Sequence, residues 1–303
     1  MKKILLFFTV ITNLIGFSFF VNAADVEIKT NTSLTPSGDD NYAVSSGNTL
    51  TATGNNYSYG KTISGAGNLT IDKDASLYLT GSNTLTGTVT IDGNLRLSST
   101  ASLSSQDIRV NNQGRLILFD KNYNDSDRII QISGQDSNQT TGAIWLVNGG
   151  GDNAAFNNST IQLNADSYIA TSKDLTFTLR DDNSDTVIVN SSDDKNYNLY
   201  LRSFNGAGTF QIDDKIDLNS GTLNILTNTT LNAGVVDMVD NATSVDVTGT
   251  YNLNSNDTIN GLSGTGTVST STVGAKTLTV GSSNSSSSFS GVIEVGSGSI
   301  NLT

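Results

Sequence analysis

The sequence predicts an all-β solenoid, in which the chain winds into stacked coils of short strands. Runs that alternate apolar and polar residues occur from residue 26 onward, for example at 69–71 and 278–280. Gly, Asn, Asp and Ser bound these runs, which indicates that turns rather than helices separate the strands. A glycine-containing pattern also recurs along the chain, and such internal repetition favours stacked coils over a sandwich or a barrel.

The composition excludes most of the common catalytic chemistries. The chain has 303 residues, of which 36% are hydrophobic, with no Cys and no His. The low apolar content indicates a thin or elongated core. Without His there is no Ser-His-Asp triad, and without Cys there is no disulfide, thiol nucleophile or Cys-bound zinc. The net charge of -12 disfavours nucleic acid and anionic lipid as partners.

Residues 1–23 have the features of a secretory signal peptide. Lys2 and Lys3 form a basic start, residues 4–21 are mostly apolar, and small residues favour cleavage after Ala23, with Ala24 as the nearest alternative. An uncleaved membrane anchor is the other interpretation, because the apolar run approaches the ~20 residues of a membrane span. Cleavage removes two lysines, which leaves 14 basic against 28 acidic residues and a net charge of -14. We therefore expect an exported protein.

The remaining chain divides into an expected N-terminal cap at 24–60 and a repetitive region at 61–303. Three segments of this region, 63–69, 204–210 and 262–268, share an apolar residue, a polar residue, Gly-x-Gly, a polar residue and a second apolar residue. The glycines of the pattern are Gly65, Gly67, Gly206, Gly208, Gly264 and Gly266. Two glycines allow a turn that other residues cannot make, so we interpret these positions as structural. The match extends over 63–97 and 251–302 as a repeat of roughly 35 to 40 residues, with a shorter copy at 204–212.

These segments resemble the passenger-associated repeats of bacterial autotransporters (type V secretion), most clearly at 79–87 and 251–259. The resemblance implies a right-handed parallel β-helix at the cell surface, outer membrane or in the extracellular medium. It implies a virulence-related role as an adhesin or surface-antigen stalk, with a host-cell or extracellular receptor, protein or glycan, as partner. It also implies a translocator barrel, which residues 261–303 do not encode. Coils of roughly 20 to 25 residues predict about 11 to 14 coils and a rod ~50 to 65 Å long.

Several groups could carry chemistry, but the interpretation of each as structural is preferred. Acidic pairs at 39–40, 181–182, 193–194 and 213–214 could bind calcium or act on sugars, yet they share no spacing and fit solvated turns. Residues 149–153 lack the spacing of a calcium repeat, and the Gly-x-Gly turns precede strands rather than the helix that a phosphate cradle requires. We therefore expect no cofactor, no metal and no catalytic residue. A secreted β-helix polysaccharide lyase or glycoside hydrolase is the alternative.

The aromatic residues include candidates for sugar or protein contact, although no ligand-binding residue is assigned. Trp145 is the single tryptophan and lies in the apolar run 143–147, so it is expected in the core. Tyrosines in polar segments are candidates for sugar or protein contacts, namely Tyr57, Tyr59, Tyr123, Tyr197 and Tyr200.

Overall fold

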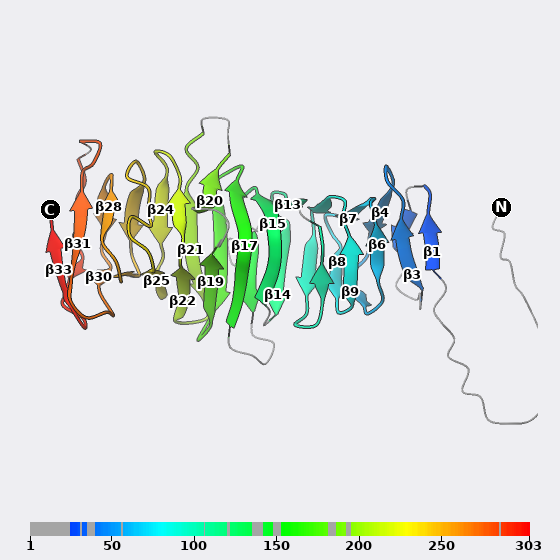
Figure 1. Cartoon of the computed structure of the whole chain (residues 1–303), viewed down its shortest axis with the longest axis horizontal. Coiled ribbons are helices and arrows are strands. Elements are labelled where there is room, and N and C mark those ends of the chain that lie inside the picture. The colour runs from blue at the N-terminus through cyan, green and yellow to red at the C-terminus, as the bar shows by residue number, and fades with distance from the viewer. Residues whose placement is uncertain are drawn as a thin grey trace, which may run out of the picture.

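In the computed structural model the chain winds into a rod of stacked β-strands (Figure 1). The structure describes residues 25–30, 32–34, 40–55, 57–105, 107–119, 122–134, 142–147, 153–180, 186–191, 195–284 and 286–303. Within these ranges there is no helix, all strand pairs are parallel, and the solenoid makes about 11 turns. At ~4.8 Å between stacked strands this is a rod ~50 Å long. The prediction of an all-β parallel β-helix is confirmed.

The longest wall of the rod is a sheet of 15 strands. Its strands, in stacking order, are β2 (Thr32–Leu34), β4 (Thr49–Ala52), β7 (Asn68–Ile71), β10 (Val89–Ile91), β13 (Asp107–Val110), β15 (Asn122–Ile132), β17 (Asn153–Leu163), β19 (Thr176–Arg180), β22 (Gly208–Ile212), β25 (Thr229–Ala233), β27 (Thr250–Leu253), β30 (Thr267–Ser269) and β32 (Val292–Ile293). β20 (Thr186–Asn190) pairs with β17 and with β23 (Lys215–Asp217) off this path.

The second wall is a sheet of 10 strands. In chain order these are β5 (Tyr57–Tyr59), β8 (Ser76–Leu79), β11 (Asn94–Leu97), β14 (Arg115–Phe119), β16 (Ile144–Val147), β18 (Ser167–Ser172), β21 (Leu199–Phe204), β24 (Thr222–Ile225), β26 (Ser244–Val247) and β29 (Leu262–Gly264). A third sheet, near the N-terminus, contains β1 (Asp25–Ile28), β3 (Asn41–Val44), β6 (Ile63–Gly65), β9 (Ser82–Leu85) and β12 (Ser102–Leu103). A fourth sheet, near the C-terminus, contains β28 (Asp257–Ile259), β31 (Ala275–Val280) and β33 (Ser299–Leu302).

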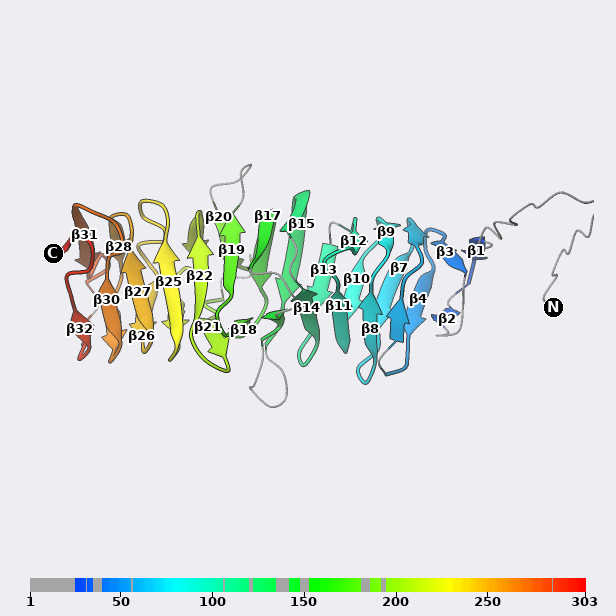
Figure 2. The same ribbon diagram turned by 90° about the horizontal axis from the view of Figure 1, so that it is seen from below.

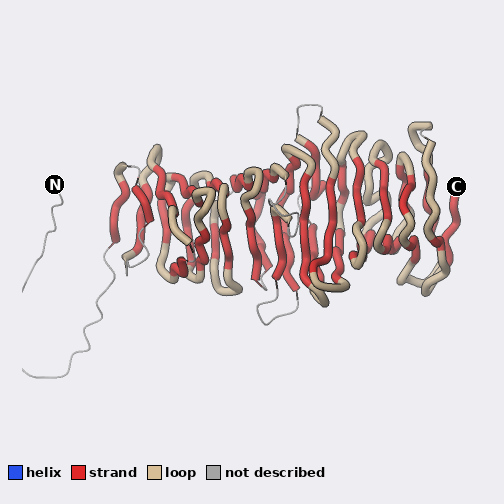
Figure 3. Tube along the Cα trace, turned by 180° about the vertical axis from the view of Figure 1, so that it is seen from behind, coloured by secondary structure: helices blue, strands red, loops and turns tan. Residues whose placement is uncertain are grey.

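Near the N-terminus each coil contributes one strand to each of three sheets, as β6, β7 and β8 do. Figure 2 shows the strands of the walls lying side by side along the rod, and Figure 3 shows loops at the corners between them. Short polar turns suffice at these corners because each coil returns to a position directly above its predecessor. Residues that follow a strand therefore occupy equivalent places in successive coils.

The coil length agrees with the repeat seen in the sequence. Leu69 pairs with Val89, and Val89 with Ile108, so these coils take 20 residues (89 minus 69) and 19 residues (108 minus 89). The repeat at 63–97 spans β6 to β11 and so comprises two coils. In the middle of the rod the coils are longer, since Phe177 pairs with Phe210, 33 residues later (210 minus 177).

Alternation along the strands builds the core. In β7, β11 and β24 buried residues alternate with half-buried ones, so every second side chain points inward. Equivalent inward side chains stack from coil to coil, as Phe156, Phe177 and Phe210 do with ring centroids 5.6 and 6.0 Å apart. A narrow core of such columns needs few apolar residues, which explains the low apolar content of the chain.

One cation is buried in this core. Arg128 is only 1% exposed and donates from Nε to the Ser105 carbonyl at 3.0 Å and from Nη2 to the Leu103 carbonyl. It lies beside a register shift in the pairing of β15 with β17. The guanidinium thus supplies donors to two backbone carbonyls of the preceding coil.

The segment 24–60, expected to be a cap, contributes strands to the same stack. β1 pairs with β3, β3 with β6, and β4 with β7. The predicted signal peptide at 1–23, with Ala23, lies outside the described residues, as does Pro36. No helix in the described part of the chain is long and apolar enough to span a membrane.

Candidate partner-binding face

The glycines of the first and third repeats form the same tight corner. Gly65 and Gly264 have φ of 99° and 104°, and a Cβ at either would lie 2.3 and 2.1 Å from a backbone oxygen of the preceding coil. Two positions later, the amide of Gly67 donates to Val44 at 2.8 Å and that of Gly266 to Val247 at 2.7 Å. The backbone of one coil therefore rests directly on that of the coil before it.

The second repeat makes a different corner. Asn205 and Gly206 have φ of 64° and 141°, and a Cβ on Gly206 would meet the flexible Lys173 side chain at 2.7 Å rather than backbone. A Cβ on Gly208 would meet Ser203 Oγ at 2.5 Å. The three Gly-x-Gly segments therefore all lie at corners of the coils, but the turns that they form differ in geometry.

The acidic pairs are scattered. Residues 39, 181–182 and 193–194 lie outside the described residues, as do residues 149–152. Asp213 is exposed and accepts a hydrogen bond from Gln211, whereas Asp214 is 9% exposed and accepts one from the Lys215 amide at 3.0 Å. Within the described ranges no three acidic side chains are grouped closely enough to hold a metal ion.

A different carboxylate is strongly perturbed. Asp257 is 1% exposed and accepts hydrogen bonds from the Tyr251 hydroxyl, the Thr258 amide at 3.0 Å and the Val239 amide at 3.3 Å. Burial raises the pKa of Asp257 to about 7 against the opposing effect of these donors, and burial also raises the pKa of Tyr251. Enclosed in this way, Asp257 joins β28 to β27 in the core and has no access to a substrate.

The nearby surface carries a polar groove of about 310 Å³. Lys215 and the carboxylates of Asp217, Asp237 and Asp240 line it. Acidic side chains gather there beside a cation, so acid and base chemistry on a sugar would be sought in this groove.

The prediction that Trp145 lies in the core is wrong. Its neighbours Ile144 and Leu146 are fully buried, so Trp145 points to the outer side of β16 and is half-buried there. Its indole Nε1 donates to Ser172 Oγ at 3.2 Å. All five residues of the run 143–147 are apolar, so the sequence had no alternation from which to read the direction of the ring.

Trp145 belongs to a group of outward aromatic side chains on the ten-stranded sheet, which we call the aromatic face. Its members are Tyr78, Phe119, Trp145, Tyr168, Tyr200 and Phe204. Their rings pair along the sheet, between neighbouring strands for Tyr168 and Tyr200 and across one intervening strand for the other two pairs. Tyr78 lies 5.5 Å from Phe119, Trp145 meets Phe204 edge-on at 5.7 Å, and Tyr168 stacks on Tyr200 at 4.4 Å.

Two hollows adjoin the Trp145 and Phe204 rings. The first, of about 240 Å³, is lined by Arg96, Ile117, Phe119, Trp145 and Val147. The second, of about 680 Å³, contains Tyr168, Arg202 and Phe204 together with the turn residues 205–206. The contact between Trp145 and Phe204 joins the two, but the second hollow is mostly polar, since Ser203, Thr227, Asn228 and Thr248 also line it.

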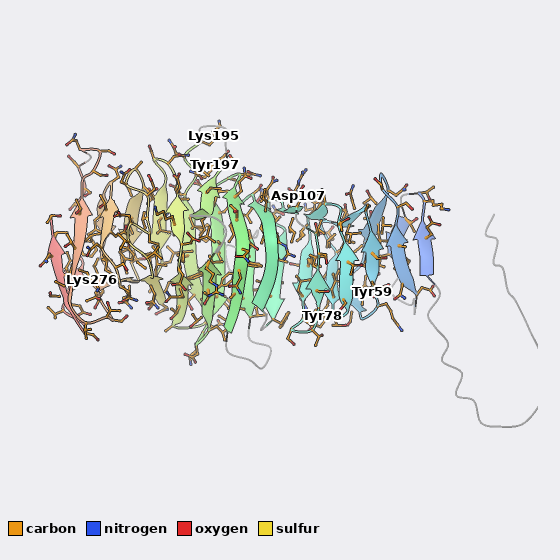
Figure 4. The ribbon with its side chains drawn as sticks, viewed as in Figure 1. Tyr59, Tyr78, Asp107, Lys195, Tyr197 and Lys276 are labelled. Carbon is orange, nitrogen blue, oxygen red and sulfur yellow. The ribbon has the colours of Figure 1, made fainter. Side chains whose placement is uncertain are left out.

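The tyrosines named as contact candidates differ in burial and in position. Tyr59 is wrongly predicted, because it is only 4% exposed and donates to the Asp40 carbonyl at 2.5 Å. Tyr200 lies on the aromatic face, Tyr57 and Tyr197 are half-buried elsewhere, and the side chain of Tyr123 lies outside the described residues. In the view of Figure 4, Tyr78 lies near the lower edge of the rod and Tyr197 near the upper edge.

Two arginines lie among the side chains of the aromatic face. Strand register places Arg96 opposite Ile117, Ile117 opposite Trp145, Trp145 opposite Ala170, and Ala170 opposite Arg202. The pKa of the neighbouring Tyr168 is raised, because the effect of burial exceeds the opposing effect of the Arg202 guanidinium. The two cations therefore lie in a single outward column with apolar side chains between them.

No protein-family model, curated protein or solved structure matches this chain.

Sequence reasoning missed this face for a definite reason. Arg96, Phe119 and Phe204 span 108 positions of the chain (204 minus 96), and only the register of the stacked coils brings them to one wall. A usable signal was present in the strands themselves. The aromatic or cationic residue at the centre of β8, β11 and β21 occupies an outward position between inward apolar neighbours.

Proposed function

We propose that the protein is an exported bacterial surface protein, an autotransporter-like passenger that acts as an adhesin without catalytic activity. In this proposal the rod is the stalk, and the aromatic face binds a host-cell or extracellular receptor. Residues 1–23 support export, and the repeats at 63–97 and 251–302 support the relation to passengers. The β-solenoid is compatible with both.

The aromatic face is the observation that carries the proposal. Six half-buried aromatic rings line the outer side of the ten-stranded sheet, and aromatic residues are enriched in protein interfaces. Trp, Tyr and Arg are the residues that contribute most to protein interfaces, and Trp145, Tyr78 and Arg96 lie together on this wall. Stacked coils also provide the long, rigid surface that an adhesin needs.

Adhesion of coated beads tests the proposal. Beads carrying purified residues 24–303 should adhere to cultured epithelial cells or to immobilised fibronectin, collagen or laminin more strongly than albumin-coated beads. Bacteria that express the full chain should release it with residue 24 as the new N-terminus. Adhesion no better than that of albumin across the whole panel would contradict the adhesin function.

The polar groove beside Asp237 favours a second candidate, the polysaccharide lyase or hydrolase. Three carboxylates and Lys215 line this groove, and such groups can serve as acid and base on a sugar. Release of unsaturated or reducing sugar from a polysaccharide panel, abolished by Asp237→Asn, would establish the enzyme and overturn the non-catalytic proposal. The non-catalytic proposal predicts no release above that of a buffer control.

A further inference from the structure

We propose that Asn205 is a site of spontaneous deamidation, at which the folded protein converts an asparagine to aspartate or isoaspartate. Asn205 is followed by Gly206, and the pair lies at the coil corner between β21 and β22. The inference goes beyond the proposed function, since the reaction needs no receptor and no enzyme. Its product is a new carboxylate in the larger of the two hollows beside the aromatic face.

The reaction takes place between two neighbouring residues and water. The backbone nitrogen of Gly206 attacks Cγ of Asn205, and a cyclic succinimide forms. The bond between Cγ and Nδ2 breaks, and this nitrogen leaves as ammonia with the proton that the Gly206 amide has lost. Water then opens the ring at either carbonyl, which gives an aspartate or an isoaspartate whose main chain runs through the side chain. No atom is oxidised or reduced.

The corner at Asn205 meets the requirements of this attack. The attacking nitrogen belongs to a glycine, so no Cβ stands beside it. Among the described residues none accepts a hydrogen bond from the Gly206 amide, so solvent hydroxide can remove its proton. The Asn205 side chain is exposed and has no hydrogen bond within the same ranges. No contact therefore holds Cγ away from the nitrogen.

The backbone can rotate between Asn205 and Gly206 without disturbing the stacked coils. The preceding residue is held, because the Phe204 carbonyl accepts a hydrogen bond from the Lys173 amide at 3.0 Å. The Gly206 carbonyl accepts one from Ser203 Oγ at 2.6 Å, a single side-chain contact at the end of a strand. Corners of this kind open locally at lower free energy than paired strands do. Glycine also tolerates the backbone angles that the ring requires.

A second Asn-Gly pair, Asn260 and Gly261, shows what protects an asparagine. Asn260 is half-buried, its amide donates to the Thr243 carbonyl at 2.9 Å, and its Nδ2 donates to Ser244 Oγ at 3.4 Å. The Gly261 carbonyl accepts from the Val245 amide at 2.8 Å. The attack at Asn260 requires these contacts between coils to open, so we expect it to be slow in the folded protein.

A left-handed backbone at an exposed corner is not sufficient for the reaction. Asn228 has a φ of 62° and lies one coil further along the same hollow. The next residue, Thr229, is β-branched, and its amide donates to the Leu226 carbonyl at 3.0 Å. Asn205 differs because its neighbour is a glycine with an unengaged amide. The third Asn-Gly pair of the chain, at 148–149, lies outside the described residues.

The product changes the charge of the hollow. Asn205 lines it together with Tyr168, Arg202 and Phe204. Either product adds one negative charge there, so deamidated molecules are retained longer on an anion-exchange column. The isoaspartate also adds a carbon to the main chain at the corner, where each coil has to return above its predecessor.

Peptide mapping of aged protein tests the proposal. Purified residues 24–303 are incubated at pH 8, folded or in urea, and then digested at acidic pH, and tandem mass spectrometry follows Asn205 and Asn260 separately. In the folded protein we expect deamidation at Asn205 to be at least about tenfold faster than at Asn260. In urea the two asparagines should react at similar rates, because both are followed by glycine and neither is protected.

Matched variants confirm the chemistry. Asn205→Gln keeps the amide but has to form a larger ring, so it should lose the charge change at this position. Glutamine suits such a corner, since Gln113 already has a φ of 74° in this protein. Asn205→Asp marks the position of the aspartate product on the anion-exchange column, and circular dichroism checks the folding of both variants.

Two outcomes would overturn the inference. Equal rates at Asn205 and Asn260 in the folded protein would show that the coil corner protects its asparagine as well as paired strands do. If wild type and Asn205→Gln gain negative charge at the same rate, the reaction takes place at other asparagines.

Discussion

At the scale of single residues, the direction of one side chain decides what the molecule offers to a partner. Trp145 lies half-buried on the outer side of β16, where it contacts Phe204 and lines a hollow together with Arg96. We predict that acrylamide quenches its fluorescence in the folded protein substantially, although less than in urea. Blue-shifted emission that acrylamide does not quench would place the ring in the core and remove the aromatic face.

The corner glycines give a paired prediction. Gly264→Ala must fit a Cβ 2.1 Å from the Val247 carbonyl oxygen at a positive φ, so we expect a loss of about 3 kcal/mol in unfolding free energy. Gly47 has a φ of 79° but no neighbouring atom within 4 Å, so Gly47→Ala should cost only about 1 kcal/mol. Urea midpoints of the two variants measure the difference. Equal losses would show that the stacked backbone is not the constraint.

Asp257 makes stability depend on pH with a defined sign. The pKa of Asp257 is about 7 in the folded protein and 3.8 for an unperturbed aspartate. Between pH 3.8 and about pH 7 the folded protein therefore holds a proton on Asp257 that the unfolded chain has lost. The contribution of Asp257 is therefore complete below pH 4 and is lost as pH rises through 7. The shift corresponds to at most about 4 kcal/mol.

Asp257→Asn cannot titrate, so it should remove this part of the pH dependence. We expect the stability of wild type relative to the variant to fall between pH 4.5 and pH 8 in urea unfolding. Asp240→Asn, a change in the neighbouring groove, serves as the control and should follow wild type. Parallel pH curves for wild type and Asp257→Asn would contradict the buried, proton-holding carboxylate.

At the scale of elements, the aromatic column of β17, β19 and β22 supports the longest coils. Phe177 is fully buried between Phe156 and Phe210. Phe177→Ala should cost about 3 to 5 kcal/mol, and Phe177→Leu about 1 kcal/mol. The outward neighbour change Thr178→Ala should lie within about 0.5 kcal/mol of wild type.

Hydrogen exchange reports where Phe177→Ala acts. Each coil of a solenoid contacts only its neighbours, so faster exchange should concentrate in β17, β19 and β22. A uniform increase along the rod would instead show that the described strands unfold as a single cooperative unit.

The same scale shows how far the sequence could predict the fold. Alternating runs such as 69–71 and 222–225 revealed strands and inward residues, because period-two patterning is local. The run 143–147 has no alternation, so the outward position of Trp145 depends on pairing with β14 and β18. The burial of Arg128 and Asp257 likewise depends on carbonyls and amides from other coils, which no local pattern encodes.

At the scale of the whole molecule, parallel stacking turns residues distant in sequence into one continuous wall. The candidate site shows this most clearly, since its residues come from β8 to β21 and no short motif contains them. The repeats at 63–97 and 251–302 reveal the coils of the rod, whereas most of the aromatic face, from Phe119 to Phe204, lies between them.

Competition for adhesion sites tests the central claim, that the aromatic face binds the receptor, most directly. Soluble residues 24–303 are added to beads coated with the same protein on the surface to which those beads adhere. The account predicts that the wild-type protein and Arg109→Gln, a change on the long sheet, block adhesion, whereas Trp145→Ala combined with Phe119→Ala loses most of this ability while remaining folded. Full inhibition by the double variant would contradict the account, because it would place receptor binding on another surface of the rod.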